Sequence, residues 1–163
     1  MSGIQVRQMS KLAVVRVRSG INARETVKKT LSLLRLTRVN HCVVVDDDPS
    51  TLGMLRMAKD YITWGEIEPE TLEHLLRKRG RLSGNRRLTD EFVKSKTKFS
   101  GIKELAVAMC AGKAEFEDVP GLKRVFRLHP PRKGYRSTKR PVGDFGDLGY
   151  RGGRINELIM RMA

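Results

Sequence analysis

The side chains best suited to do chemistry in this sequence are arginines and lysines, because they gather in two blocks. Residues 77–103 contain ten basic and two acidic side chains, a balance of 10 − 2 = +8, and residues 121–143 contain eight basic side chains and no acidic one. With a net charge of +15 over 163 residues, such blocks produce a field that attracts a polyanion. Neither block has the long apolar face of a membrane-surface helix. Nucleic acid is therefore the favoured partner.

Arginine and lysine in these blocks alternate with Gly, Pro and Ser, so the chain there is too polar to order itself by burial. RNA would order it through phosphate contacts and through stacking of Arg and Tyr135 on unpaired bases. We therefore expect residues 132–140 to be mobile in the free protein. No helix-turn-helix, C₂H₂ finger or basic zipper indicates DNA instead. The residues predicted to bind RNA are Arg81, Arg86, Arg87, Lys94, Lys96, Lys98, Arg132, Lys133, Tyr135, Arg136, Lys139, Arg140 and Arg151.

Clustered carboxylates and glycines offer two weaker possibilities for a site. Asp46, Asp47 and Asp48 would suit a hard cation, but acids in a solvated loop before a helix N-terminus are the simpler interpretation. The segment GDFGDLGYRGG at 143–153 is rich in glycine, yet it matches neither nucleotide-binding pattern and carries two aspartates that would repel phosphate. We expect no metal and no cofactor.

Cysteine and histidine show no spacing typical of nucleophilic catalysis or zinc binding. Cys42 and Cys110 lie in apolar runs, so we expect both thiols to be core groups. The histidines are scattered along the chain, at His41, His74 and His129. No catalytic residue is therefore predicted. The sequence has no apolar run of the roughly 20 residues that a membrane helix needs and no signal-peptide pattern, so we expect a soluble, intracellular protein.

The elements that must position the basic blocks begin with a β-α-β-α-β pattern over residues 11–67. Helix-spaced leucines and valines lie between runs of β-branched and apolar residues. We expect Asn22 and Glu25 to form a capping box for the first helix, and Ser50 or Thr51 to cap the second. Strands are expected at 12–17, 41–46 and 62–67.

Both helices can lie on one face of the resulting small sheet, which leaves the other face to RNA or to the rest of the chain. A single core would then collect apolar side chains from the strands and helices of residues 11–67. Its predicted members are Leu12, Val14, Val27, Leu31, Leu34, Val43, Val45 and Leu55.

The remaining sequence predicts a helical extension followed by a long loop. Residues 129–153 contain too many Gly and Pro residues and too few core residues to fold by themselves. The other expected elements are helices that begin at Pro69, at Thr89 and at Ser100 or Gly101, a strand over 122–128 and a C-terminal helix over 154–162.

Residues 11–67 resemble the ribosomal protein family numbered thirty in the large subunit of bacteria and archaea, which is numbered seven in eukaryotes. The matching pieces are Arg-Ser-x-Ile at 18–21, Thr-Leu-x-Leu-Leu-Arg-Leu at 30–36 and Gly-Met at 53–54. The segments PETLEHLLRKRGRL, HPPRKGYRSTKRP and YRGGRINELIMRM are similar to the additional part of archaeal and eukaryotic members. Only about ten residues precede the first strand, whereas eukaryotic members have a long basic arm, so the chain looks archaeal.

This resemblance implies a structural, non-enzymatic constituent of the large (50S) ribosomal subunit in the cytoplasm. The implied fold is α+β, with a ferredoxin-like β-α-β-α-β core, a small antiparallel sheet, a helical extension and a long basic loop. The implied partners are large-subunit ribosomal RNA and neighbouring ribosomal proteins, with 5S RNA as a further candidate, and no membrane or small-molecule substrate. The expected division is an N-terminal tail at 1–10, a core domain at 11–67 and an extension at 68–163.

Two other functions stay open at this point. A free-standing RNA-binding regulator or processing factor would show the same charge pattern, but it would leave ribosomes at moderate salt. A small ferredoxin-like hydrolase, such as an acylphosphatase, would need an Arg and an Asn arranged around a phosphate loop. Residues 18–22 are the one faint candidate for such a loop.

Overall fold

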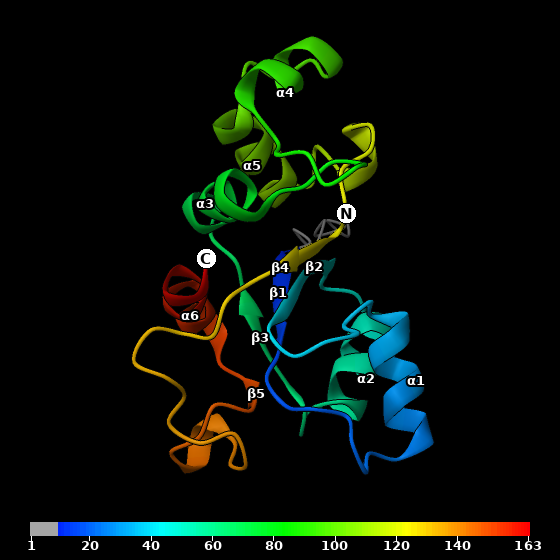
Figure 1. Ribbon diagram of the computed structural model, residues 1–163, viewed down its shortest axis with the longest axis vertical. Coiled ribbons are helices and arrows are strands. Elements are labelled where there is room, and N and C mark those ends of the chain that lie inside the picture. The colour runs from blue at the N-terminus through cyan, green and yellow to red at the C-terminus, as the bar shows by residue number, and fades with distance from the viewer. Residues whose placement is uncertain (1–9) are drawn as a thin grey trace, which may run out of the picture.

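The computed structural model of the protein describes residues 10–163 (Figure 1). The tail predicted over residues 1–10 lies outside them, apart from Ser10. The described residues form one five-stranded sheet with the strand order β4-β2-β1-β3-β5. The elements of its N-terminal part are β1 (Lys11–Arg16), α1 (Glu25–Leu33), β2 (His41–Asp46), α2 (Pro49–Met57) and β3 (Ile62–Glu66).

The predicted β-α-β-α-β core is confirmed. Strand β1 lies between β2 and β3 and pairs with both in antiparallel fashion, so that Val14 is opposite Val43 on one side and Trp64 on the other. Helices α1 and α2 lie on the same face of the sheet (Figure 1). All eight predicted core residues pack in one cluster on that face, seven of them buried and Val45 partly buried.

The other face of the sheet is covered by the chain itself. Helix α6 (Ile155–Met162) packs there, α3 (Pro69–Arg79) packs against α6, and α5 (Ile102–Cys110) packs against α3 toward the end of the molecule that carries α4 (Figure 1). Their apolar residues form a second cluster with Ala13, Val15 and Cys42, which point to this side of the sheet. The sequence left open whether RNA or the rest of the chain covers this face. In the structure the rest of the chain covers it. The short helix α4 (Asp90–Lys96) begins as predicted at Thr89, whose side chain accepts the Phe92 N–H.

The sheet is mixed rather than purely antiparallel, because the extension adds a strand at each edge. Strand β4 (Val125–Arg127) pairs antiparallel with β2, and β5 (Gly149–Tyr150) pairs parallel with β3. The strand predicted over 122–128 is therefore shorter than expected. The segment 129–153 is not one extended loop either, because it contains β5 and the 3-10 turn Val142–Asp144.

The expected caps of α1 and α2 were wrong. Asn22 has a left-handed backbone, with φ of 66°, and lies in a turn before the helix, which starts only at Glu25. The short polar side chain that suggested a cap also makes Asn tolerant of this conformation. Helix α2 starts at Pro49, whose fixed φ suits the first helical position, so Asp48 takes the N-cap position instead of Ser50 or Thr51.

A buried lysine joins the core to the extension. The Lys11 side chain is 4 % exposed, and its ammonium lies 2.8 Å from a Glu115 oxygen and also pairs with Asp46. Burial disfavours the charge, but the hydrogen bonds to the two carboxylates outweigh it and raise the pKa of Lys11. The core and the extension thus share an ion pair and one sheet. The domain boundary at residue 67 stays a prediction.

Candidate nucleic-acid interface

The two basic blocks of the sequence meet at one groove of about 560 Å³. The groove lies between the C-terminal end of α3, the turn that follows it, the start of the 129–153 segment and the end of α6. We call it the basic groove. Its lining consists of His74, Arg77, Lys78, Arg79, Arg81, Arg87, His129, Arg132, Met160 and Ala163.

Backbone hydrogen bonds fix the walls of the basic groove. The turn after α3 is closed by a bridge between Arg81 and Arg87 and by the Leu88 N–H, which donates to the Gly80 carbonyl at 3.2 Å. On the opposite wall the Arg132 N–H donates to the Arg161 carbonyl at 3.1 Å. The cations of the groove therefore stand on segments that are held in place before any partner binds.

The charge of the basic groove is strongly one-sided. Six of its lining side chains are arginine or lysine, and no acidic side chain lines it. Arg77 differs from the other cations of the groove, because its guanidinium pairs with Glu73 at 3.0 Å and with Asp90 at 2.7 Å. The other cations converge without a carboxylate between them. Such a concave, positive surface concentrates field lines and attracts a polyanion.

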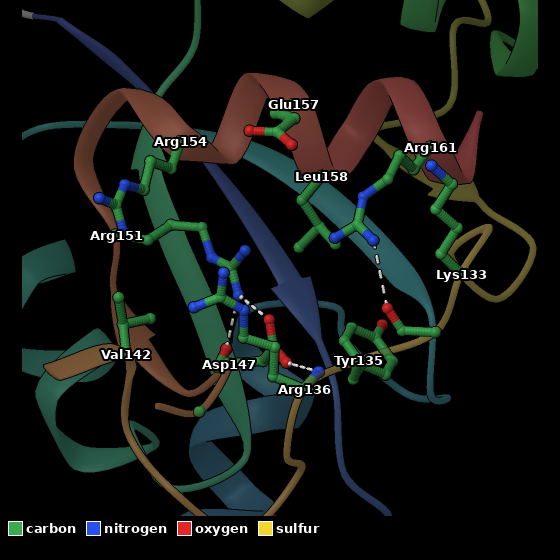
Figure 2. Close-up of a pocket in the computed structure, with 12 residues that line it drawn as sticks. Lys133, Tyr135, Arg136, Val142, Asp147, Arg151, Arg154, Glu157, Leu158 and Arg161 are labelled. Carbon is green, nitrogen blue, oxygen red and sulfur yellow. Dashed lines mark hydrogen bonds and ion pairs between the residues drawn. The ribbon is translucent and has the colours of Figure 1, made fainter. Parts of the chain in front are cut away.

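A second cavity, of about 610 Å³, lies between α6 and the 129–153 segment (Figure 2). Its cationic lining residues are Lys133, Arg136, Arg151, Arg154 and Arg161, and its acidic ones are Asp147 and Glu157. Here the charges are partly matched within the protein. Arg151, for example, pairs with Asp147 at 2.9 Å. The Arg161 guanidinium donates to the carbonyls of Arg132 at 3.1 Å and Gly134 at 3.2 Å, which ties α6 to the segment.

The expectation that nothing in the chain orders residues 132–140 was wrong. The buried Asp147 accepts the backbone N–H groups of Arg136 and, at 3.2 Å, of Ser137. Tyr135 packs against the second core cluster, and its hydroxyl donates to Asn40 Oδ1 at 3.1 Å. Burial raises the pKa of Tyr135 to about 12. These contacts hold the middle of the segment against the body of the protein.

The structure gives the predicted RNA-binding residues different environments. It brings Arg81, Arg87 and Arg132 together in the basic groove, whereas Lys133, Tyr135, Arg136 and Arg151 line the second cavity. Lys94, Lys96 and Lys98 are exposed on and after α4, Arg86 is exposed in the turn after α3, and Lys139 and Arg140 are exposed in the basic loop.

Two of these residues have clear structural tasks. The Arg151 side chain is 7 % exposed, lies 2.9 Å from Asp147 Oδ1 and donates to Thr63 Oγ1 at 2.8 Å. The Tyr135 ring is half-buried in the way just described. We therefore do not include Arg151 or Tyr135 in the interface proposed below.

The basic groove also contains residues that were not among the predicted RNA-binding set. Lys78 and Arg79 end α3, where they complement the helix dipole, and His74 and His129 face the same groove. The sequence does show the basic end of the helix. It does not show that Arg132, more than fifty positions later, lies across the groove from it.

The described residues contain no candidate metal centre. Within 10–163 no group of three His, Cys, Asp or Glu residues could hold a metal ion. Burial raises the pKa of the Cys42 thiol to about 12, as expected of a core group. At the 18–22 segment the Arg18 guanidinium lies 5.4 Å from the centre of the Tyr61 ring. No helix of residues 10–163 is long and apolar enough to span a membrane.

The fold and the groove define a class, a strongly basic α+β protein with a ferredoxin-like core and a helical extension. The family model Ribosomal protein L30p/L7e matches residues 12–62. Large ribosomal subunit protein uL30 of Archaeoglobus fulgidus is 53 % identical over 150 residues, 92 % of this chain and 98 % of that protein. The uL30 proteins of Methanocorpusculum labreanum and Methanopyrus kandleri are 50 % identical over 150 residues and 49 % identical over 148.

The chain belongs to this family, the uL30 proteins of the large ribosomal subunit, in its archaeal form. The resemblance stated from the sequence is thereby confirmed. The family is structural and not enzymatic, which removes the hydrolase alternative.

Proposed function

We propose that this structural constituent of the cytoplasmic large ribosomal subunit binds large-subunit ribosomal RNA at the basic groove. The groove neutralises phosphates where RNA segments come close together. The observation that carries the proposal is the meeting of Arg79, Arg81, Arg87 and Arg132 in one concavity without an acidic lining side chain. Phosphate contacts of this kind supply most sequence-independent affinity for nucleic acid.

Exposed cations outside the groove would extend the contact. Arg86, Lys94, Lys96 and Lys98 belong to the first basic block, and Lys133, Arg136, Lys139 and Arg140 to the second. All eight are exposed. In this proposal they add phosphate contacts along the RNA, while the groove fixes the orientation of the protein on it.

Removing the groove charges should lower the salt dependence of RNA binding. The variant R79A/R81A/R87A/R132A loses four phosphate contacts, so the slope of log affinity against log salt should fall by about three to four, at 0.7 to 0.9 per contact. The measurement is the dissociation constant for a transcribed large-subunit ribosomal RNA fragment at several salt concentrations between about 50 and 200 mM.

A matched control separates the groove from net charge. The variant R24A/K28A/K29A/R56A removes four exposed cations from around α1 and α2, and so it has the same net charge as the groove variant. Its slope should stay within one unit of the wild-type slope. Equal losses in both variants would contradict the groove and leave only a general attraction between a basic protein and RNA.

The protein should co-sediment with large subunits through a sucrose gradient and stay there in an ordinary salt wash. Many phosphate contacts release together, so partial salt screening leaves the complex intact. Sequencing of RNA crosslinked to the bound chain would identify the helices that it contacts, and whether 5S RNA is among them. Recovery mainly in the free-protein fractions would favour the regulator or processing factor.

A further inference from the structure

Phe145 combines two properties that a side chain without a partner rarely has. It is 77 % exposed, although it is one of the largest apolar side chains. Its backbone is also left-handed, with φ of 54° and ψ of 33°. This conformation disfavours side chains larger than Asn or Asp, and a bulky residue in it is an outlier. Both properties cost stability in the free protein.

The backbone around Phe145 is held firmly. The N–H groups of Asp144 and Gly146 both donate to the Pro141 carbonyl at 2.9 Å, and the Asp147 N–H donates to the Ser137 carbonyl at 3.0 Å. A Cβ at Gly146 would overlap the Arg140 carbonyl, so the turn depends on that glycine. The strained conformation therefore belongs to a closed turn. Backbone strain that persists in this way is typical of functional positions.

The surroundings of Phe145 are those of a nucleic-acid contact. The turn lies at the end of the molecule opposite α4 (Figure 1). Residues 136–140 hydrogen-bond to Asp147 and Leu148 of this turn and carry three exposed cations, Arg136, Lys139 and Arg140. Asp144 is the single exposed acid of residues 136–148. Cations that hold a phosphate backbone beside an aromatic ring that faces a base are the usual elements of a single-stranded RNA contact.

We propose that Phe145 stacks on an unpaired base of the RNA to which the protein binds. This inference rests on the RNA-binding function proposed above and adds a base contact to it. The sequence pointed to Tyr135 for stacking, but that ring is half-buried against the core, whereas Phe145 is free to face a base. A flat, apolar pocket of a neighbouring protein is the competing occupant. Its chemistry does not account for the three cations on the adjoining residues 136–140.

Three substitutions test the stacking. F145A should weaken binding of the full chain to a large-subunit ribosomal RNA fragment by about five- to hundredfold, the range for loss of one base–aromatic stack. The salt slope should not change, because stacking releases no counterions. F145L should lose about as much affinity as F145A, whereas F145W should bind as tightly as wild type. I21A, at a side chain that is 79 % exposed, is the control and should bind as wild type does.

Stability gives a second, independent readout. F145N should raise the thermal unfolding midpoint, because Asn adopts the left-handed conformation at low cost, and it should weaken RNA binding as F145A does. Ultraviolet crosslinking of the wild-type complex, followed by mass spectrometry, should find a nucleotide adduct at residue 145.

The outcomes separate this inference from the function on which it rests. F145A binding within twofold of wild type would overturn the stacking and leave the groove proposal in place. F145L binding as tightly as wild type would also overturn it, since an aliphatic contact would then suffice. Wild-type affinity no greater than that of an acidic control protein for the same RNA would overturn both proposals.

Discussion

Asp147→Ala should release the 129–153 segment from the body of the protein. The carboxylate is buried, pairs with the Arg151 guanidinium at 2.9 Å and accepts two backbone N–H groups. Removal of one partner of a buried ion pair leaves the other charge without compensation and typically costs about 3 to 5 kcal/mol. We expect a loss of that size in the free energy of unfolding, measured with denaturant. Trypsin should also cleave the variant faster after Arg136 and Lys139.

The neighbouring acid provides the control. Asp144 is three positions away and exposed, so Asp144→Ala should change the free energy of unfolding by no more than about 0.5 kcal/mol. If Asp147→Ala is no more sensitive to trypsin than Asp144→Ala, the ion pair does not hold the segment, and the order of the segment has another cause.

Leu31→Ala should lower the free energy of unfolding by about 2 to 5 kcal/mol, the usual range for a large-to-small change in a core. Leu31 is 2 % exposed and lies in the cluster between α1, α2 and the sheet. Truncation there removes buried apolar surface and leaves a cavity. Urea unfolding followed by circular dichroism measures the difference.

The same helix carries a matched control at Leu33. That side chain is 63 % exposed, so Leu33→Ala should shift the free energy of unfolding by no more than about 0.5 kcal/mol. The two variants have the same chemistry and nearly the same position. Equal effects would show that α1 does not present Leu31 to the sheet.

Local patterns were enough to predict the first half of the fold. The strand at 41–46 has the predicted bounds, and the three strands and two helices of residues 11–67 occur in the predicted order. These elements are short and follow one another, so each apolar residue finds partners on neighbouring elements. Period-2 and period-3.6 patterns are informative in such a case. The misassigned cap at Asn22 shows their limit, because Asn suits both a helix N-cap and a left-handed turn.

The second half of the fold depends on contacts between distant residues, which no local sequence pattern shows. Residues 149–150 are too few to predict as a strand, and β5 forms because β3 offers an unpaired edge. Among the glycines of 143–153, Gly146 serves packing, because a Cβ there would overlap the Arg140 carbonyl. That close approach accounts for the glycine there without a phosphate ligand.

Charge indicated which blocks favour a polyanion but not which of their side chains would be free. Arg132 and Arg151 look alike in the sequence, yet Arg132 is exposed in the basic groove. The Arg151 side chain is buried, pairs with Asp147 and donates a hydrogen bond to Thr63. Only the fold separates a cation that holds the protein together from one that faces outward. The basic composition therefore overestimates the number of cations available to a polyanion.

The covering of the second sheet face by α6 has a consequence for synthesis. Ala13 and Leu158 share one cluster although they stand far apart in the chain. At about 5 to 20 residues per second, the residues between β3 and α6 take roughly 5 to 20 s to translate. During that time the three finished strands have one bare apolar face. The growing chain is therefore most exposed to aggregation, and most open to a chaperone, in the interval between completion of β3 and emergence of α6.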